Sequence, residues 1–214
     1  MLGFLPVSWT EIATVISTFA GFLSALIVAF LGRVLYDWWT SPKLCAYPTR
    51  NDPSVQEEYR RAFYHITIRN ARKRLGLMVK PVENARVTIV YYSEKKEEFS
   101  IPAKWDFRPE PLRYEKEGIS LDPSLIPQAE LLDISPGSEQ SLCICMKYKG
   151  DENIYGFNAF SYLHPDLKNP DWKLGKGKYK VRAILIAANA YAEFSVALQN
   201  LGTDFNDVKV ADPS

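Results

Sequence analysis

The first part of the chain holds one long apolar run, whereas the remainder alternates in short segments. Residues 12–31 carry no charged side chain. An α-helix over these twenty residues is about 30 Å long, which matches the thickness of a hydrocarbon core. The run is too long for a signal-peptide core, no basic segment precedes it, and no convincing cleavage site follows it. We therefore expect residues 1–39 to be a membrane anchor with one transmembrane helix over about 12–31, extending to aromatic residues at 36–39.

Aromatic residues stand at both ends of this run. Trp9 precedes it, and Tyr36, Trp38 and Trp39 follow it. Amphipathic rings are enriched at membrane–water interfaces, and a long basic side chain such as Arg33 can extend to the headgroups. These five residues are the predicted membrane-interface contacts.

The basic residues near the run predict its direction. The N-terminal flank has no Lys or Arg, whereas Arg33, Lys43 and Arg50 lie on the C-terminal flank. Cytoplasmic flanks carry the excess of positive charge in most single-pass proteins. We therefore expect the C-terminal domain to lie in the cytoplasm.

The chain has three cysteines, Cys45, Cys143 and Cys145. An odd number cannot pair completely within one chain. Cys143 and Cys145 are two residues apart in a strand-like run, so we expect them on the same face and poorly placed to bridge each other. Free thiols in a reducing compartment are the favoured interpretation, and a bond from Cys45 to one of the other two is the alternative.

Small residues recur at every fourth position of the apolar run. In a bilayer, helices associate through close packing, which small residues at such spacing permit. The row drifts by about 40° per step around a straight helix, so a straight partner could use only its centre. The alternative is an Ala-rich helix that lies alone in lipid. The predicted helix–helix contact residues are Ala13, Ser17, Gly21, Ala25 and Ala29.

Residues 44–200, which follow a linker at 40–43, consist of short runs rich in Val, Ile, Tyr and Phe. Corners are supplied by 14 prolines and 11 glycines. Several runs alternate between apolar and polar positions, which is typical of half-buried strands. The apolar faces are Tyr64, Ile66 and Ile68; Val87, Ile89 and Tyr91; and Tyr179, Val181, Ala183 and Leu185.

The runs predict a mainly β fold, an antiparallel β-sandwich after the N-terminal helix. SPGSE (135–139) is a predicted tight turn, AANAYAEF (187–194) a predicted hairpin, and SVQEEYRRA (54–62) the one weak helix candidate. Residues 201–214 are expected to form a polar tail. The predicted strand runs are FYHITIRN, ARVTIVYY, EFSIPAKW, AELLDI, SLCICMKY, IYGFNAFSYL, KYKVRAILIAA and AEFSVALQ.

Two stretches carry a resemblance to a known group of domains. HITIRNARKRLGLMVKPVENARVTIVYY resembles the strand, Asn, basic loop and second strand of immunoglobulin-like domains such as the CARDB group. ELLDISPG and GKYKVRAILIAANAYAEFSV resemble the closing strands of membrane-anchored proteins of unknown function with such a sandwich. The resemblance implies an immunoglobulin-like fold, which these families often use for adhesion or assembly. It carries over no catalytic residue, and fold alone does not give function.

The loop RNARKRLG (69–76) concentrates basic residues, and it is the candidate anion-binding site. Anionic lipid headgroups would be its target if it faced the membrane. The alternative is a solvated hairpin tip. The formal net charge of the chain is only +1, and the loop lacks interleaved aromatic residues, so nucleic acid is disfavoured as a partner. The candidate residues are Arg69, Arg72, Lys73 and Arg74.

The sequence offers no catalytic or metal motif. His65 and His164 are far apart, and no H-x-x-x-H, C-x-x-C, G-x-S-x-G or phosphate-binding loop occurs. An enzyme would need a pocket in which His, Asp or Cys side chains converge, and no such cluster is evident. We expect no catalytic residue, no metal and no cofactor.

These observations favour a non-enzymatic, single-pass membrane protein that assembles with itself or with another membrane protein. The alternative is a membrane-tethered sensor or effector that binds an anionic ligand, either a lipid headgroup or a nucleotide, through the basic loop.

Overall fold

The computed structural model describes residues 8–49, 54–74, 77–94, 96–115 and 118–212. The chain forms two compact units, Met1–Ser41 and Pro42–Ser214. We describe each unit by itself.

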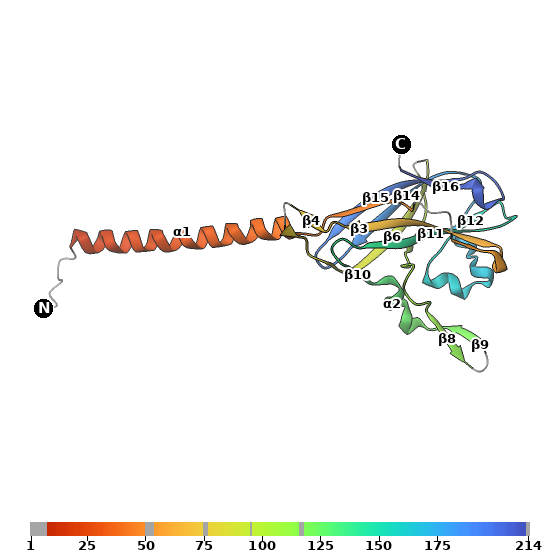
Figure 1. Ribbon diagram of the computed structural model, residues 1–214, viewed down its shortest axis with the longest axis horizontal. Helices are drawn as coiled ribbons and strands as arrows, with labels where there is room; N and C mark the ends of the chain where they lie inside the picture. Colours follow the sequence, from red (N-terminus) through yellow and green to blue (C-terminus); the bar gives the residue numbers. More distant parts are fainter. Residues whose placement is uncertain (1–7, 50–53, 75–76, 95, 116–117, 213–214) are drawn as a thin grey trace. The chain divides into compact units, whose positions relative to one another are not determined.

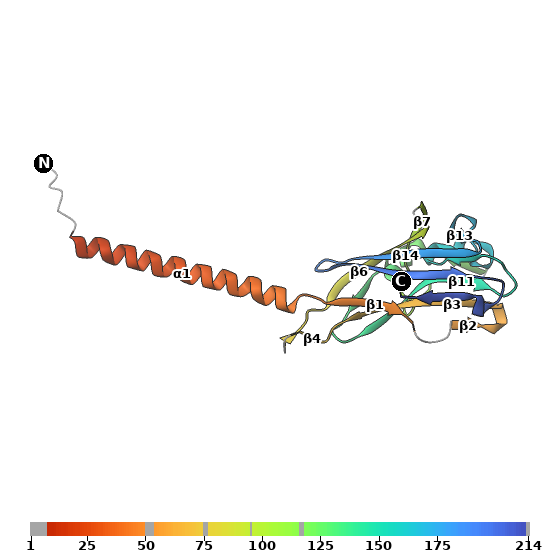
Figure 2. The ribbon, with the colours of Figure 1, turned by 90° about the horizontal axis from the view of Figure 1, so that it is seen from above.

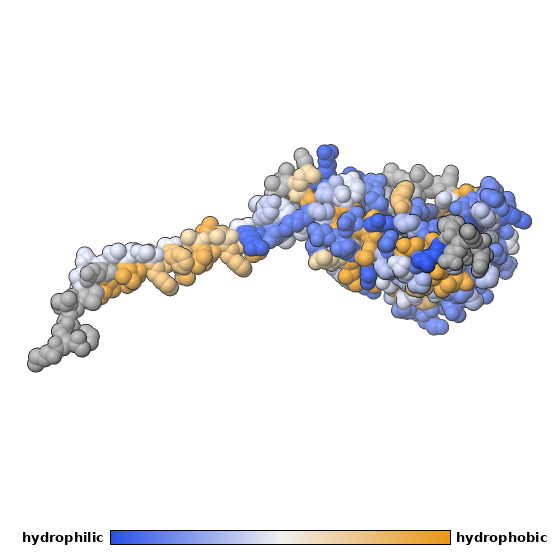
Figure 3. All heavy atoms as spheres, turned by 90° about the horizontal axis from the view of Figure 1, so that it is seen from below, coloured by the Kyte–Doolittle hydropathy of each residue, from blue (hydrophilic) through white to orange (hydrophobic). Residues whose placement is uncertain are grey.

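The first unit is one helix, α1, over Trp9–Thr40. Its segment Ile12–Thr40 is long and apolar enough to cross a membrane, and the side chains from Ile12 to Trp39 are exposed. Apolar side chains follow α1 along its length (Figure 3). Hydroxyl groups within it donate to backbone carbonyls one turn earlier; the Thr18 Oγ1 to Thr14 O distance, for example, is 2.8 Å. The hydroxyls that bond in this way are therefore satisfied inside the helix.

The second unit is a β-sandwich of two antiparallel sheets (Figures 1 and 2). The first sheet has the order β1-β3-β11-β12-β13 with β2 paired to β3, and its strands are β1 (Leu44–Pro48), β2 (Ser54–Gln56), β3 (Arg61–Asn70), β11 (Glu139–Tyr148), β12 (Ile154–Gly156) and β13 (Lys173–Leu174). The second has the order β10-β6-β14-β15-β16 with β7 paired to β6, and its strands are β6 (Val82–Ser93), β7 (Lys96–Pro102), β10 (Leu132–Ile134), β14 (Gly177–Ile186), β15 (Tyr191–Asn200) and β16 (Val208–Ala211). The predicted mainly β fold, an antiparallel sandwich after a long apolar helix, is confirmed.

Short elements complete the domain. Two small hairpins are β4 (Lys73–Arg74) with β5 (Leu77–Met78), and β8 (Leu112–Glu115) with β9 (Gly118–Leu121). The other short elements are α2 (Ile126–Glu130) and the 3-10 turns η1 (Glu57–Tyr59), η2 (Pro123–Leu125), η3 (Ala159–Leu163), η4 (Pro165–Leu167), η5 (Pro170–Trp172) and η6 (Phe205–Asp207).

The core lies between the two sheets, and the sequence alternation identifies its inner faces. Tyr64, Ile66 and Ile68 of β3 belong to the buried cluster, as do the predicted apolar faces of β6 and β14. His65 points to the opposite face of β3, as expected from the pattern. Alternation therefore identified the core where strands are regular.

A β-bulge overturns the expectation that Cys143 and Cys145 share a face. Cys143 lies opposite His65 on β3, whereas Cys145 lies opposite Tyr64, so β11 carries one extra residue, Ile144. Cys143 consequently joins a cluster on the outer face of the sheet, and Cys145 joins the core. A bulge reverses the alternation beyond it, which a period of two cannot anticipate.

Three predicted runs differ from the structure. AELLDI begins in α2 and only its end is strand β10. IYGFNAFSYL is strand β12 followed by η3, because Asn158 caps a helical turn through both its side chain and its backbone. SVQEEYRRA, the weak helix candidate, forms β2, η1 and the start of β3.

Residues 201–212, the described part of the segment expected to form a polar tail, instead contribute to the sandwich. Strand β16 pairs with β15, and Phe205 and Val208 pack into the core. Asp204 caps η6, so one acidic residue of this segment organises a turn. Burial of two apolar side chains overrides the polar composition of this segment.

Candidate functional site

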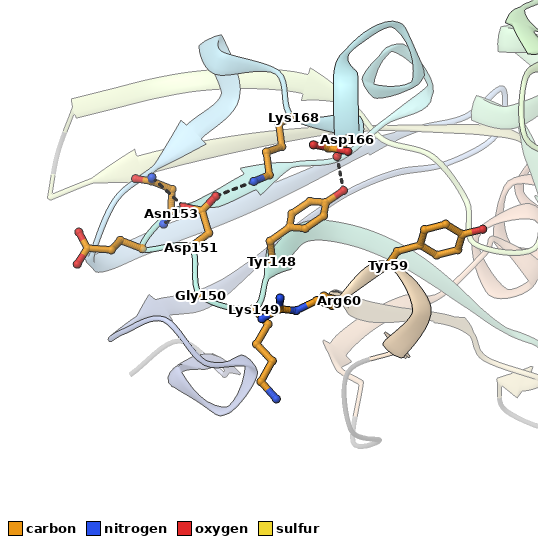
Figure 4. Close-up of a pocket in the computed structure, with 10 residues that line it drawn as sticks. Tyr59, Arg60, Tyr148, Lys149, Gly150, Asp151, Asn153, Asp166 and Lys168 are labelled. Atoms are coloured by element: carbon orange, nitrogen blue, oxygen red, sulfur yellow. Dashed lines mark hydrogen bonds and ion pairs between the residues drawn. The ribbon is translucent and has the colours of Figure 1, made fainter.

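An open polar cleft of about 630 Å³ lies on the sandwich. It lies where η1, the turn between β11 and β12, and η4 meet (Figure 4). We call it the open cleft. It is lined by Tyr59, Arg60, Tyr148, Lys149, Gly150, Asp151, Glu152, Asn153, Asp166 and Lys168.

Asp151 organises the open cleft. Its carboxylate accepts hydrogen bonds from the backbone N of Asn153 at 2.9 Å and from the hydroxyl of Tyr155 at 3.1 Å, and it pairs with Lys168 Nζ at 3.0 Å. Partial burial raises the pKa of Asp151, but the hydrogen bonds from Asn153 and Lys168 outweigh it and lower the pKa to about 2. The carboxylate is therefore ionised and fully engaged at neutral pH.

Two further charged side chains of the open cleft, Lys168 and Glu152, are also engaged. Lys168 Nζ lies 4.2 Å from the centre of the Tyr148 ring, and the Tyr148 hydroxyl donates to the carbonyl of Asp166 (Figure 4). Glu152 pairs with Lys176 at 2.8 Å, outside the lining. Arg60 and Lys149 remain as exposed side chains at the rim. The cleft is therefore built chiefly as a stabilising network.

A second, more enclosed hollow of about 210 Å³ lies on the outer face of the first sheet, and we call it the charged pocket. Strands β2, β3 and β11, the segment 104–110 and η3 form its walls. Its lining residues are Ser54, Gln56, Phe63, His65, Lys104, Asp106, Arg108, Glu110, Cys143, Phe157 and Tyr162.

Trp105 fixes the segment that brings acidic and basic side chains to this pocket. Its buried ring donates from Nε1 to the carbonyl of Glu130 at 2.9 Å, and its backbone bridges to Leu142 of β11. The next residue, Asp106, donates its backbone N–H to the carbonyl of Ser141 at 3.0 Å. The segment therefore runs beside the start of β11.

Three groups converge at the floor of the charged pocket. His65 Nε2 lies 3.3 Å from Asp106 Oδ1, and Cys143 lies directly opposite His65 in the pairing of β11 with β3. Burial lowers the pKa of His65, but the neighbouring Cys143 and the contacts with Asp106 outweigh it and raise the pKa above its ordinary value. The expectation that no His, Asp and Cys converge is wrong, because the sheet brings together residues 65, 106 and 143.

The order thiol, imidazole, carboxylate is the one used in nucleophilic catalysis. Here, however, only 2% of Cys143 is exposed, and burial raises the pKa of its thiol, which the His65 charge only partly offsets. The thiol donates to the carbonyl of Cys145. A protonated, buried thiol is a poor nucleophile, so the geometry favours a structural role for Cys143. No group of three or more His, Cys, Asp or Glu within the described residues is placed to hold a metal ion.

Lys104 and Arg108 place positive charge in the same pocket. Lys104 Nζ donates to the carbonyls of Trp105 at 3.3 Å and Arg108 at 3.1 Å. Burial lowers the pKa of Lys104, and the nearby negative charges oppose that shift. The Arg108 Nε–H is buried and has no hydrogen-bond partner in the described part of the chain. A buried donor without an acceptor is uncommon and needs an explanation.

The predicted helix-contact and interface residues lie on α1. Ala13, Ser17, Gly21, Ala25 and Ala29 are exposed, as are Trp9, Arg33, Tyr36, Trp38 and Trp39. The Ser17 hydroxyl donates to the carbonyl of Thr14, and Arg33 lies 3.9 Å from Asp37. The predicted contacts of both groups remain predictions.

The basic loop is not gathered into one site by the described side chains. Arg69 pairs with Glu139 at 3.7 Å, and Arg72 is exposed next to the turn at Gly137. Lys73 and Arg74 form strand β4, but their side chains lie outside the described part. The sequence missed the charged pocket, although alternating charges in KWDFRPE (104–110) offered a signal.

Comparison with protein-family models and with curated proteins finds no match to this chain. The resemblance to CARDB-like domains therefore stays a prediction.

Proposed function

We propose that this protein is a membrane-anchored, non-enzymatic sensor whose sandwich binds a small ligand bearing a carboxylate in the charged pocket. The observation that carries the proposal is the buried Nε–H of Arg108, which lacks an acceptor among the described residues. An unsatisfied buried donor costs about 1–3 kcal/mol, and more when it belongs to a charged group. A bound carboxylate would remove that cost.

The chemistry of the two basic side chains selects a carboxylate. A guanidinium is always charged and presents its N–H groups in a planar fork that matches a carboxylate. Lys104 uses two of its three N–H donors on backbone carbonyls, so one remains for a ligand. Both residues line the same pocket of about 210 Å³, which is small for a drug-sized ligand.

Binding is favoured over catalysis by the state of the titratable groups. In the open cleft, the pKa of Asp151 is lowered to about 2 and that of Tyr155 is raised to about 12, so neither exchanges a proton near neutral pH. In the charged pocket, burial raises the pKa of the Cys143 thiol. General acids and bases work best with a pKa near the operating pH. The proposal therefore assigns the protein no catalytic residue.

Membrane attachment is the second part of the proposal, and α1 supports it by length and composition. We place the sandwich in the cytoplasm, following the basic residues after the helix. Cys45 is exposed and provides a reporter. A membrane-impermeant maleimide should label Cys45 in broken cells but not in intact cells, with Cys45→Ser as the unlabelled control. Equal labelling of Cys45 in intact and broken cells would show the opposite orientation, with the sandwich outside the cytoplasm.

Carboxylate binding is tested by calorimetry on the full chain in detergent micelles. Propionate is the probe, and propionamide is the neutral control of similar shape. We expect binding of propionate, at least tenfold weaker binding of propionamide, and loss of propionate binding in Arg108→Gln.

The matched control for Arg108→Gln is Arg60→Gln, which removes an exposed guanidinium from the open cleft and should leave propionate binding unchanged. Equal binding of propionate and propionamide, or an Arg108→Gln variant that binds propionate as the wild type does, would overturn the proposal. Thermal unfolding of each variant shows that it is folded.

A further inference from the structure

The charged pocket has an acidic side as well as a basic one. Lys104, Asp106, Arg108 and Glu110 alternate along one segment and all line the pocket. Phe107, between them, is 79% exposed. A ligand with only a carboxylate would bind the two basic side chains, Lys104 and Arg108. It would offer no hydrogen-bond donor to the two acidic ones, Asp106 and Glu110.

The two carboxylates have spare hydrogen-bonding capacity. Asp106 contacts His65 through Oδ1, and Glu110 Oε1 accepts from the Tyr162 hydroxyl at 2.8 Å. In the described part of the chain, no hydrogen bond engages Asp106 Oδ2 or Glu110 Oε2. Each ionised carboxylate can accept about four hydrogen bonds. The pocket can therefore accept donors as well as supply them.

Of the two, Glu110 is the freer acceptor. Asp106 holds the imidazole of His65, and this contact lowers the pKa of Asp106. Glu110 accepts from the neutral phenol of Tyr162, and its charge also acts on Lys104. A cationic group of a ligand would gain a new ion pair at Glu110, whereas at Asp106 it would compete with His65.

An apolar wall completes the charged pocket. Phe63 and Phe157 line it, and their rings meet edge to face with centroids 4.9 Å apart. The volume of about 210 Å³ lies below the range of roughly 300–1,000 Å³ that is usual for drug-sized ligands. A ligand of about ten or fewer heavy atoms with a small apolar part suits this space.

We propose that the ligand is a small zwitterion of the α-amino-acid class. Arg108 and Lys104 hold its carboxylate, Glu110 accepts from its ammonium group, and the Phe63 and Phe157 rings contact its side chain. This inference rests on the proposed function, because it uses the same carboxylate contact and adds a second one.

The proposal has a consequence for selectivity. Propionate leaves the acidic side of the pocket facing a ligand with no donor, and propylamine leaves the buried Arg108 Nε–H unsatisfied. A zwitterion satisfies both sides at once. A site that leaves a buried polar group unpaired discriminates strongly against the ligand responsible, which here is propylamine at the Arg108 Nε–H. Propionate instead lacks the ion pair with Glu110, which is exposed.

The experiment compares L-alanine, propionate and propylamine by calorimetry on the full chain in detergent micelles near neutral pH. We expect alanine to bind at least tenfold more tightly than propionate, and propylamine to bind most weakly. Glu110→Gln should reduce alanine binding to the level of propionate and leave propionate binding unchanged or stronger.

Two variants serve as controls for Glu110→Gln. Glu152→Gln removes an acidic side chain of the open cleft and should change neither affinity. Tyr162→Phe removes the partner of Glu110 without removing its charge and should preserve the preference for alanine. Thermal unfolding of each variant shows that it is folded.

The outcomes separate the two proposals. If propionate binds as tightly as alanine or more tightly, or if Glu110→Gln leaves the preference for alanine intact, the zwitterion inference is overturned and carboxylate binding stands. If neither alanine nor propionate binds, the proposed function itself fails, and the inference fails with it.

Discussion

The open cleft and the charged pocket differ in how their polar groups are satisfied. The cleft is three times larger, at about 630 Å³ against 210 Å³, yet its central carboxylate, Asp151, already has its partners. The pocket is smaller but keeps a buried guanidinium N–H of Arg108 without an acceptor among the described residues. The proposed ligand site therefore rests on this unsatisfied donor and not on the size of the hollow.

Under the proposed function, the open cleft contributes stability and the charged pocket binds the ligand. Substitution of a central residue of the cleft should then lower the free energy of unfolding without changing ligand affinity. Substitution of Arg108 or Glu110 should change ligand affinity without lowering the free energy of unfolding. The predictions that follow, from the largest expected effect to the smallest, test this division.

The largest expected effect is that of Asp151→Ala. The substitution leaves Lys168 and Tyr155 without their acceptor in a partly buried network, so we expect a loss of about 2–3 kcal/mol in the free energy of unfolding. Urea unfolding of the full chain in micelles measures it. The neighbouring Glu152→Ala removes only an exposed pair with Lys176 and should cost clearly less. An equal loss in the free energy of unfolding for the two variants would show that Asp151 contributes no more than Glu152.

The two regions should also lose stability at opposite ends of the pH scale. The pKa of Asp151 falls from 3.8 to about 2 on folding, so its contribution is present above pH 3.8 and is lost as the pH falls towards 2. The contacts with Asp106 and Cys143 raise the pKa of His65 above 6.5, so its contribution is present below pH 6.5 and is lost as the pH rises through the raised pKa.

Unfolding free energies measured across pH test these two windows. In Asp151→Asn, the free energy of unfolding should fall less steeply at acid pH and be unchanged in its alkaline dependence. In His65→Gln, it should fall less steeply at alkaline pH only. An unchanged acid dependence in Asp151→Asn would contradict the assignment for the cleft.

Thiol reactivity provides a smaller effect that compares the charged pocket with the core. Cys45 is exposed, Cys143 lines the pocket and Cys145 is buried between the sheets. We expect iodoacetamide to modify Cys45 first, then Cys143, and Cys145 about tenfold more slowly than Cys143, because only a small hollow reaches Cys143. Peptide mass spectrometry measures the three rates. Faster modification of Cys145 than of Cys143 would show that the bulge does not separate them as described.

The smallest expected effect concerns the backbone of the open cleft. Gly150 has φ of +87°, a conformation that favours glycine, and no atom lies within 4 Å of an added Cβ. Gly150→Ala should therefore cost only about 1 kcal/mol of unfolding free energy through backbone strain. In Gly137→Ala, φ is +81° and an added Cβ would lie 3.1 Å from Arg72 Cβ, so that variant should cost somewhat more in the same urea measurement.

Regular strands were predictable from the sequence, and the reason is local. Tyr64, Ile66 and Ile68 alternate with polar neighbours, and this period of two identifies the buried face of β3 without knowledge of its partners. The turn at Gly137 and the hairpin between β14 and β15 followed from equally local signals. The prediction was wrong where the regular strand is interrupted. Asn158 caps a helical turn after β12, and Ile144 is an extra residue in β11.

The candidate site was not predictable from motifs. Residues 65, 106 and 143 are far apart in sequence, and only the pairing of β3 with β11 and the anchoring of Trp105 bring their side chains together. Arg108 gives no signal in the sequence, because exposed arginines are common and burial of its Nε is a property of the fold.

The sequence by itself determined the long apolar helix and the sandwich, because both depend on composition and on short-range periodicity. The tertiary structure alone decided that Cys143 faces outward while Cys145 faces the core, and that the last residues complete a sheet. It also decided which charges are satisfied and which are not. Satisfaction of a buried charge depends on distances between strands that are remote in the chain, and a pattern along the chain contains no such distance.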